Sequence, residues 1–146
     1  MADPRVHGPI DFVFLEFPGD ASGAATARAL MELVDRGTVR LYDVMVIRKD
    51  EDGRCTEIDL PGASDRGLGD WSRFSGARSG LLGVEDLDLA AGVLDAGKTG
   101  AVILFENTWA VPFVGAARSE GGELVASARL TAQQVMDALD AVEMAS

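Results

Sequence analysis

The sequence predicts an α+β fold with a ferredoxin-like βαββαβ core, an added αβα extension, and a mixed sheet with helices mainly on one face. Three observations support this prediction. Short apolar runs alternate with amphipathic stretches of helical period, and glycine or proline separates them. Two stretches of the chain also echo each other in the order strand, helix, strand. Duplicated split β-α-β units of this kind build ferredoxin-like sheets.

The first half of the chain is predicted to form a strand, a helix and a hairpin. The run "DFVFLEF" is dense in apolar residues and ends at a Pro-Gly pair, which is typical of a buried strand. The helix that follows can be capped by Asp20 or Ser22 and stops at Gly37. An Asp-Gly turn then joins two strands. The predicted ranges are strand 11–17, helix 20–37, and strands 39–47 and 55–60.

The second half opens with residues 61–83, which are rich in glycine and carry no sustained period, although "DWSRFSG" can form one short helical turn. We therefore expect a long irregular loop, and long ordered loops are often functional. Pro112 suits a first helical turn, and Thr131 with Gln134 forms a capping box. The predicted ranges after the loop are helix 84–97, strand 101–106, helix 107–122, strand 123–130 and helix 131–146.

Composition favours one globular domain spanning residues 1–146, with a mobile leader at 1–10. The chain is 47% hydrophobic and 25% charged, and its formal net charge is -11. The basic residues are dispersed, so we expect no nucleic-acid partner. No stretch approaches the roughly twenty apolar residues that span a bilayer. The sequence therefore predicts an acidic cytoplasmic protein without membrane insertion.

The chain has one cysteine, Cys55, and one histidine, His7, which lies in the leader. A disulfide and an ordinary zinc site both need more such residues. A Ser-His-Asp or Cys-His relay needs His7 to fold back onto the body. We therefore predict no metal, no cofactor and no catalytic residue of these kinds.

The stretch "GVLDAGKTG" fits the spacing G-x-x-x-x-G-K-[ST] from Gly92 to Thr99. A phosphate-binding loop needs a strand before it and a helix after it, because the ligand sits at the positive end of that helix. Here the predicted helix comes first and the strand follows. We expect Gly97 to end the helix, Lys98 to complement its C-terminus, and neither ATP nor GTP to bind.

Aromatic, arginine and polar side chains on irregular segments are typical anchors for partners or ligands. They are also typical plugs at the open end of a core, and the sequence leaves both readings open. The candidates for ligand or partner binding are Trp71, Arg73, Phe74 and Arg78 in the long loop, and Glu106, Asn107 and Trp109 at a strand-to-helix corner.

Glu16 and Glu106 end the two most apolar strands, at matching places in the echo. If these strands are neighbours, the two carboxylates can pair and serve as acid and base. The alternative is that each glutamate lies at a solvated strand end near the start of the next helix, which favours a negative charge.

The segments "GPIDFVFLEFPG", "LVDRGTVRLYDVMVIRKDEDG", "LLGVEDLDLAAGVLDAGKTGAVILFENTWAVPF" and "GGELVAS" together resemble an uncharacterised actinobacterial family of unknown function. That family is similar to a broader group of small bacterial proteins described as stress-associated or membrane-associated. The resemblance implies the same fold and a small-residue turn, rather than a phosphate loop, at "DAGKTG". The broader group often has a long apolar segment where this chain has the polar "SDRGLGDWSRFSGARSGLLG", which argues against a membrane role.

These observations predict a non-enzymatic interaction or assembly module that binds itself, as a homo-oligomer, or another protein. A small-ligand sensor, with a pocket between the long loop and the Trp109 corner, is the alternative. An enzyme that uses Glu16 and Glu106 is the third reading.

Overall fold

The computed structural model describes residues 7–18, 21–123 and 132–145. Its centre is a four-stranded sheet in which every neighbouring pair of strands is antiparallel. The order across the sheet is β1 (Ile10–Phe17), β4 (Thr99–Glu106), β2 (Arg40–Lys49) and β3 (Cys55–Glu57). Strands β1 and β2 therefore flank β4, and helix α1 (Ala24–Asp35) connects them. This arrangement is a split β-α-β unit.

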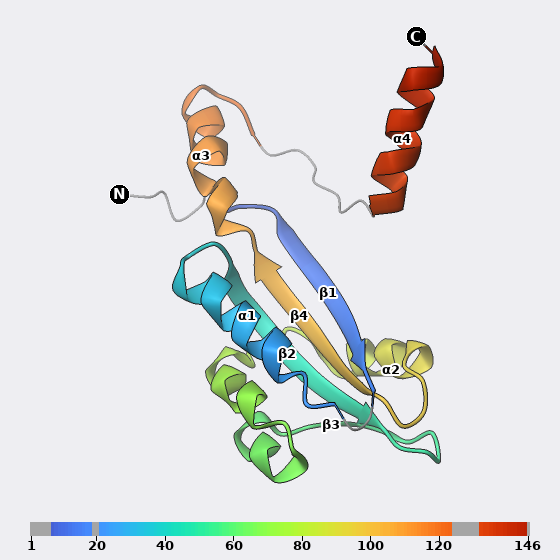
Figure 1. The fold of residues 1–146 in the computed structure, drawn as a ribbon. Coiled ribbons are helices and arrows are strands. Elements are labelled where there is room, and N and C mark those ends of the chain that lie inside the picture. Colours follow the sequence, from blue (N-terminus) through green and yellow to red (C-terminus); the bar gives the residue numbers. More distant parts are fainter. Residues whose placement is uncertain (1–6, 19–20, 124–131, 146) are drawn as a thin grey trace.

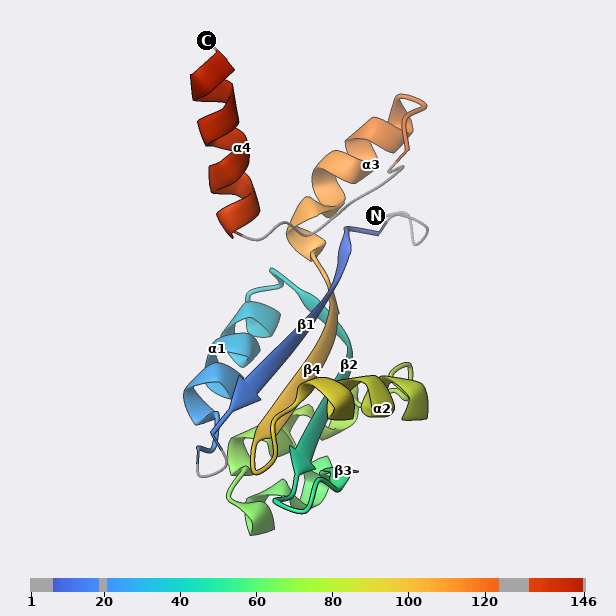
Figure 2. The ribbon, with the colours of Figure 1, turned by 90° about the vertical axis from the view of Figure 1, so that its right-hand side faces the viewer.

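Helices cover both faces of this sheet (Figures 1 and 2). Helix α1 packs on one face with two 3₁₀ helices, η1 (Leu60–Arg66) and η2 (Gly69–Ala77). Helix α2 (Val84–Val93) packs on the other face. Successive residues of β2 alternate between the two cores: Val44 and Val46 face α1, whereas Met45 and Ile47 face α2.

The prediction of an α+β fold is confirmed, but two of its details are wrong. The sheet is antiparallel rather than mixed, and its helices do not gather mainly on one face. The reason lies in the central strands, which are apolar on both sides, so both faces of the sheet must be covered. The stripe of α2, which includes Ala90 and Leu94, is buried against the face opposite α1.

Residues 61–83 were predicted to be an irregular loop, and most of them form η1 and η2 instead. Their apolar residues recur at intervals of three, which is the period of a 3₁₀ helix. A search for the α-helical period of 3.6 overlooks that spacing. The short helical turn expected in "DWSRFSG" is confirmed as part of η2. The buried residues that follow this spacing are Leu60 and Ala63 in η1, then Leu68, Trp71 and Phe74.

The chain continues from β4 through the short 3₁₀ helix η3 (Thr108–Ala110) into α3 (Val111–Ser119). As predicted, Pro112 lies in the first turn of α3. Helix α4 (Ala132–Ala145) comes last, and the side chains described in it are exposed. The predicted strand 123–130 falls, apart from its first residue, outside the described residues, and so does Thr131 of the predicted capping box.

The junction between α2 and β4 has the order that the sequence predicts, with the helix before Gly97 and the strand after it. Gly97 does not end the helix as predicted, because α2 already ends at Val93; Gly97 lies in the turn before β4 with a φ of 80°, the left-handed conformation that glycine adopts most easily. Gly92 lies inside α2. The ammonium group that complements the helix end is not that of Lys98, however. Lys49 Nζ donates hydrogen bonds to the carbonyl oxygens of Ala91 (2.7 Å) and Leu94 (3.0 Å).

Candidate functional site

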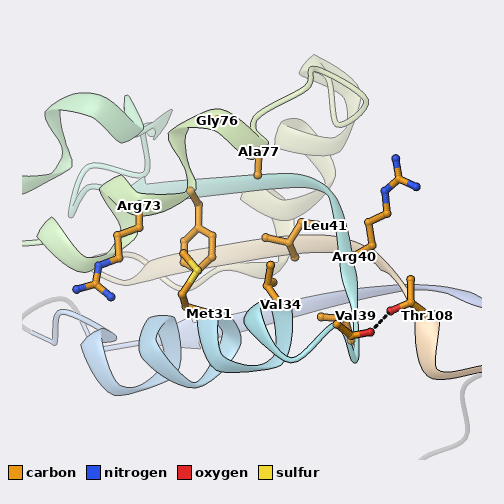
Figure 3. Close-up of a pocket in the computed structure, with 11 residues that line it drawn as sticks. Met31, Val34, Val39, Arg40, Leu41, Arg73, Gly76, Ala77 and Thr108 are labelled. Atoms are coloured by element: carbon orange, nitrogen blue, oxygen red, sulfur yellow. Dashed lines mark hydrogen bonds between the residues drawn. The ribbon is translucent and has the colours of Figure 1, made fainter.

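A groove of about 580 Å³ runs between α1 and η2 and extends to Thr108 of η3 (Figure 3). We call it the α1–η2 groove. Helix α1 contributes Met31 and Val34, and η2 contributes Phe74 and Ala77. The first residues of β2 form its floor. The groove therefore lies between the segment predicted as a long loop and the corner that carries Trp109.

The groove exists because α1 and η2 lie over the same face of the sheet without closing on each other. It is apolar because their apolar side chains line it. Phe74 is buried, whereas Met31, Val34 and Leu41 remain partly exposed along the groove. Gly76 of η2 and Gly37 after α1 add no side chain to the walls. An apolar groove of this kind can accept the apolar face of a helix or an apolar ligand.

Two arginines mark the ends of the α1–η2 groove. In Figure 3 Arg73 projects outward at the η2 end, and Arg40 projects outward at the β2 end. Both side chains are exposed. The Arg40 guanidinium lies 5.8 Å from the centre of the Tyr42 ring, which supports its position by a cation–π contact. Arg73 makes no ion pair within the described residues. Each end of the groove thus offers a positive charge.

Thr108 fixes η3 against the turn that follows α1. Its hydroxyl donates a 2.6 Å hydrogen bond to the carbonyl oxygen of Gly37, and the N–H of Trp109 donates one of 3.2 Å to that of Thr38. These two bonds bring the corner after β4 to the end of the groove near Arg40. The walls of the groove consequently come from segments far apart in sequence.

Trp71, one of the predicted binding residues, is a core residue. It is 1% exposed, and its ring packs against those of Phe17 and Phe74. Its indole N–H donates to the carbonyl oxygen of Ser22 at 3.0 Å. Trp71 therefore holds η2 against the chain before α1. Of the two interpretations that the sequence left open, Trp71 fits a plug at the end of the core. Arg73 and Phe74 are the two candidates from this segment that line the groove.

Arg78 has a structural role in an ion-pair cluster. Its guanidinium donates to the carboxylates of Asp43 (2.7 Å) and Glu57 (2.9 Å). Asp43 is fully buried and also accepts the backbone N–H groups of Ser79 and Leu82. Burial acts to raise the pKa of Asp43, but these hydrogen bonds and the Arg78 charge outweigh it and lower the pKa below its ordinary 3.8. The cluster ties the segment before α2 to β2.

Glu106 is also buried, at 2% exposure, and serves as a hydrogen-bond acceptor at the end of β4. It accepts the N–H of Gly8 at 2.7 Å and the Tyr42 hydroxyl at 2.9 Å. Tyr42 is the extra residue of a β-bulge in β2, which re-aims its side chain. Burial first, and then the hydrogen bond and charge of Glu106, raise the pKa of Tyr42 above its ordinary 10.0.

Asn107 and Trp109 lie next to this pair. The Asn107 amide donates to the Pro9 carbonyl oxygen (3.1 Å) and to Asp11 (2.8 Å), and its own oxygen accepts the Trp109 indole N–H at 3.1 Å. The Trp109 ring is 58% exposed and packs on Phe113. Of the predicted corner residues, Trp109 is thus the one that offers a large exposed apolar surface.

The hypothesis of a catalytic glutamate pair is wrong. Strands β1 and β4 are neighbours, but they run antiparallel, with Glu106 opposite Ile10 and Glu16 opposite Gly100. Six residues of strand separate the two carboxylates, which is about 20 Å. Glu16 instead lies 3.8 Å from Lys98 Nζ. General acid–base catalysis by the two groups needs them around one substrate.

Sequence reasoning did not identify the α1 side of the groove or Arg40. Met31 and Val34 belong to the apolar stripe of α1, and residues of that stripe supply both the core and the groove wall. Arg40 is the first residue of β2, and a charged residue at the start of a strand does not by itself indicate a binding site. The interval of three in η2 was a usable signal for that wall of the groove, because it matches the period of a 3₁₀ helix.

The described residues contain no cluster of three or more His, Cys, Asp or Glu side chains arranged to hold a metal ion. Among the helices in the described ranges, none combines the length and apolar content that crossing a membrane requires.

Comparison with known proteins gives one match. The model of a family of unknown function, DUF6325, matches residues 6–145. No curated protein and no solved structure matches the chain. The matched region includes every strand and helix described above. The chain therefore belongs to the DUF6325 family of unknown function.

Proposed function

We propose that the protein is a non-enzymatic protein-interaction module whose α1–η2 groove receives an acidic amphipathic helix. The observation that carries this proposal is an apolar groove of about 580 Å³ with an exposed arginine at each end. Apolar grooves bind the apolar faces of helices through side chains spaced at i, i+3 or i+4, and i+7.

The two arginines favour an elongated occupant. They point outward from opposite ends of the groove (Figure 3), so an occupant must extend along it to reach both. A helix can meet both guanidinium groups with acidic side chains while its apolar residues cover Leu41 and Ala77.

The net charge of -11 opposes the approach of an acidic partner. At physiological ionic strength, charges separated by more than about 8 Å are largely screened. Arg40 and Arg73, at the two ends of the groove, lie within that distance of an occupant. Local attraction therefore decides which helix binds, and the distant charge mainly affects the association rate.

Titration of the isotope-labelled full chain with two synthetic helical peptides tests the proposal. Both peptides carry the same apolar stripe, and one has acidic flanks where the other has lysines. We expect the acidic peptide to shift the backbone NMR signals of Leu41, Gly76 and Thr108. The variant Arg73→Glu should weaken this binding by about tenfold. Equal binding of both peptides, or shifts confined to β1 and α2, would contradict the proposal.

A small apolar ligand with an anionic head is the second candidate. The volume of the groove lies within the range of roughly 300–1,000 Å³ that is typical of ligand sites. Such a ligand would make the protein a sensor, and it would engage one arginine only. Thermal unfolding with medium-chain fatty acids and their methyl esters tests it. Stabilisation by the acids alone, lost in one of the variants Arg40→Gln and Arg73→Gln, is the expected result for a ligand site.

A further inference from the structure

We propose that the acidic helix in the α1–η2 groove is α4 of a second copy of this chain. Two copies would exchange their α4 helices reciprocally and form a closed two-fold dimer. This inference rests on the proposed function and names the partner. Its basis is the match between the groove and α4 in polarity and charge.

Helix α4 has an exposed apolar stripe. Val135, Leu139 and Val142 follow one another at i, i+4 and i+7, so they lie on one face. Their exposed fractions are 42%, 56% and 67%. A helix of this kind gains most of its stability by burying its apolar face against another surface. The stripe has the spacing that a groove between a helix and a sheet accepts.

The charges of α4 complement those of the groove. The helix carries Asp137, Asp140 and Glu143 and no lysine or arginine. At 100° per residue, Glu143 lies about 80° from the centre of the stripe, and Asp140 lies about 140° from it. Both lie on the same side of the stripe. A helix seated by its apolar face therefore presents the Glu143 carboxylate at the edge of the groove, where Arg40 or Arg73 can reach it, and carries Asp140 on the side turned away from the groove.

A second apolar groove suits α4 less well. Phe12 of β1 and Leu89 and Val93 of α2 line a smaller groove of about 140 Å³ on the opposite face of the sheet. Asp86 also lines it, and Glu85 and Asp88 belong to the same helix. An acidic helix is repelled there, because like charges in contact are unfavourable. Charge therefore favours the α1–η2 groove, with its two arginines, over this second groove.

A second copy is favoured over the chain's own α4. In both ribbon views α4 stands clear of α1 and η2 (Figures 1 and 2), and its apolar side chains are exposed. Reciprocal exchange covers two stripes and two grooves at once, which moves the buried area toward the roughly 1,200–2,000 Å² of stable interfaces. The interface is also closed, because each copy uses the same two surfaces.

Two charge-reversal variants of the full chain test the exchange. Variant A carries Arg40→Glu and Arg73→Glu in the groove, and variant B carries Asp140→Lys and Glu143→Lys in α4. All four side chains are exposed, so both variants should fold, as circular dichroism can verify. In each variant alone, helix and groove carry like charges. We expect the wild type to be a dimer in light scattering. In each variant alone, the dissociation constant of the dimer should rise roughly hundredfold.

Mixing A with B supplies the decisive measurement. The acidic helix of A meets the arginines of B, and the lysine-bearing helix of B meets the glutamates of A. We therefore expect a one-to-one heterodimer with near wild-type affinity. A monomeric wild type, or a dimer that neither variant weakens, would overturn the exchange. So would a mixture that remains monomeric, the result expected if α4 folds into its own groove.

These outcomes separate the exchange from the proposed function. If the wild type is monomeric but the acidic synthetic peptide still binds and Arg73→Glu weakens it, the groove accepts an acidic helix from a different protein, and only the exchange is wrong. If the peptide does not bind and the groove signals do not shift, the function proposed for the groove is wrong as well.

Discussion

At the scale of single residues, the buried polar side chains of this protein hold segments together. Asp43 and Glu106 are almost fully enclosed, and most of their hydrogen bonds join parts of the chain far apart in sequence. A buried carboxylate persists only when donors satisfy it. Both residues should therefore affect stability rather than binding.

Asp43→Asn should lower the free energy of unfolding by about 3 kcal/mol, because it leaves the Arg78 guanidinium and three backbone N–H groups without a charged acceptor. Urea denaturation measures the loss. Glu57→Gln is the matched control on the same arginine. Since Glu57 is more exposed, its loss should stay below about 1 kcal/mol. Equal effects of the two changes would refute the role given to Asp43.

The ion pair of Asp43 with Arg78 also makes the stability of the fold depend on pH. The pKa of Asp43 is lower in the folded protein than its ordinary 3.8, so its stabilising effect is complete above that value. It is lost as the pH falls through the folded-state pKa. The difference in stability between the wild type and Asp43→Asn should therefore shrink below about pH 4. A difference that stays constant down to acid unfolding would show that Asp43 is not ionised in the fold.

Glu106→Gln should lower the pKa of Tyr42 toward 10.0, because the variant removes the negative charge that now opposes ionisation of the phenol. Tyr42 is the single tyrosine of the chain, so ultraviolet titration reports on it alone. The unfolding free energy should also fall by about 1–3 kcal/mol. An unchanged Tyr42 titration curve would mean that the phenol and the carboxylate are not hydrogen-bonded in solution.

At the scale of elements, the sequence predicted strands and helices well where the local pattern decides them. Strand β1, helix α1 and the β2–β3 hairpin follow from apolar runs and from glycines at turns. Strand β3 ends earlier than predicted because Leu60 begins η1. The 3₁₀ helices were missed because their stability comes from burying Trp71 and Phe74 in the core, not from an α-helical period.

Lys49 and Lys98 differ in a way that the sequence did not predict. Lys49→Met should destabilise the protein by about 1–2 kcal/mol, since it leaves two carbonyl groups at the end of α2 without their ammonium donor. Lys98→Met should cost about 0.5 kcal/mol or less, because its ion pair with Glu16 is partly exposed. Thermal unfolding of the two variants compares them directly.

If the turn at Gly97 were a nucleotide site, Lys98 would matter more than Lys49. Lys98 would then be the residue whose loss abolishes stabilisation by ATP, as expected for a phosphate-binding lysine. Because the helix precedes Gly97 and a strand follows it, we expect no stabilisation by ATP in the wild type or in either variant.

At the scale of the whole molecule, the sequence predicted the α+β class but not the arrangement of the layers. Which face of the sheet a helix covers depends on contacts between distant segments. The local pattern of α2, for example, does not distinguish the two faces. The groove is likewise invisible in the sequence, because α1, β2, η2 and η3 each contribute a few residues to it.

The most direct test of the central claim, that α4 of one copy occupies the α1–η2 groove of another, uses a spin label. Ala141→Cys in α4, in a Cys55→Ser background, carries the label on one unenriched copy, which is mixed with an isotope-labelled copy of the wild type. The account predicts strong broadening of the NMR signals of Gly76, Ala77 and Thr108 in the isotope-labelled copy, which carries no spin label. Sharp groove signals, with broadening absent or confined to other surfaces, would contradict it.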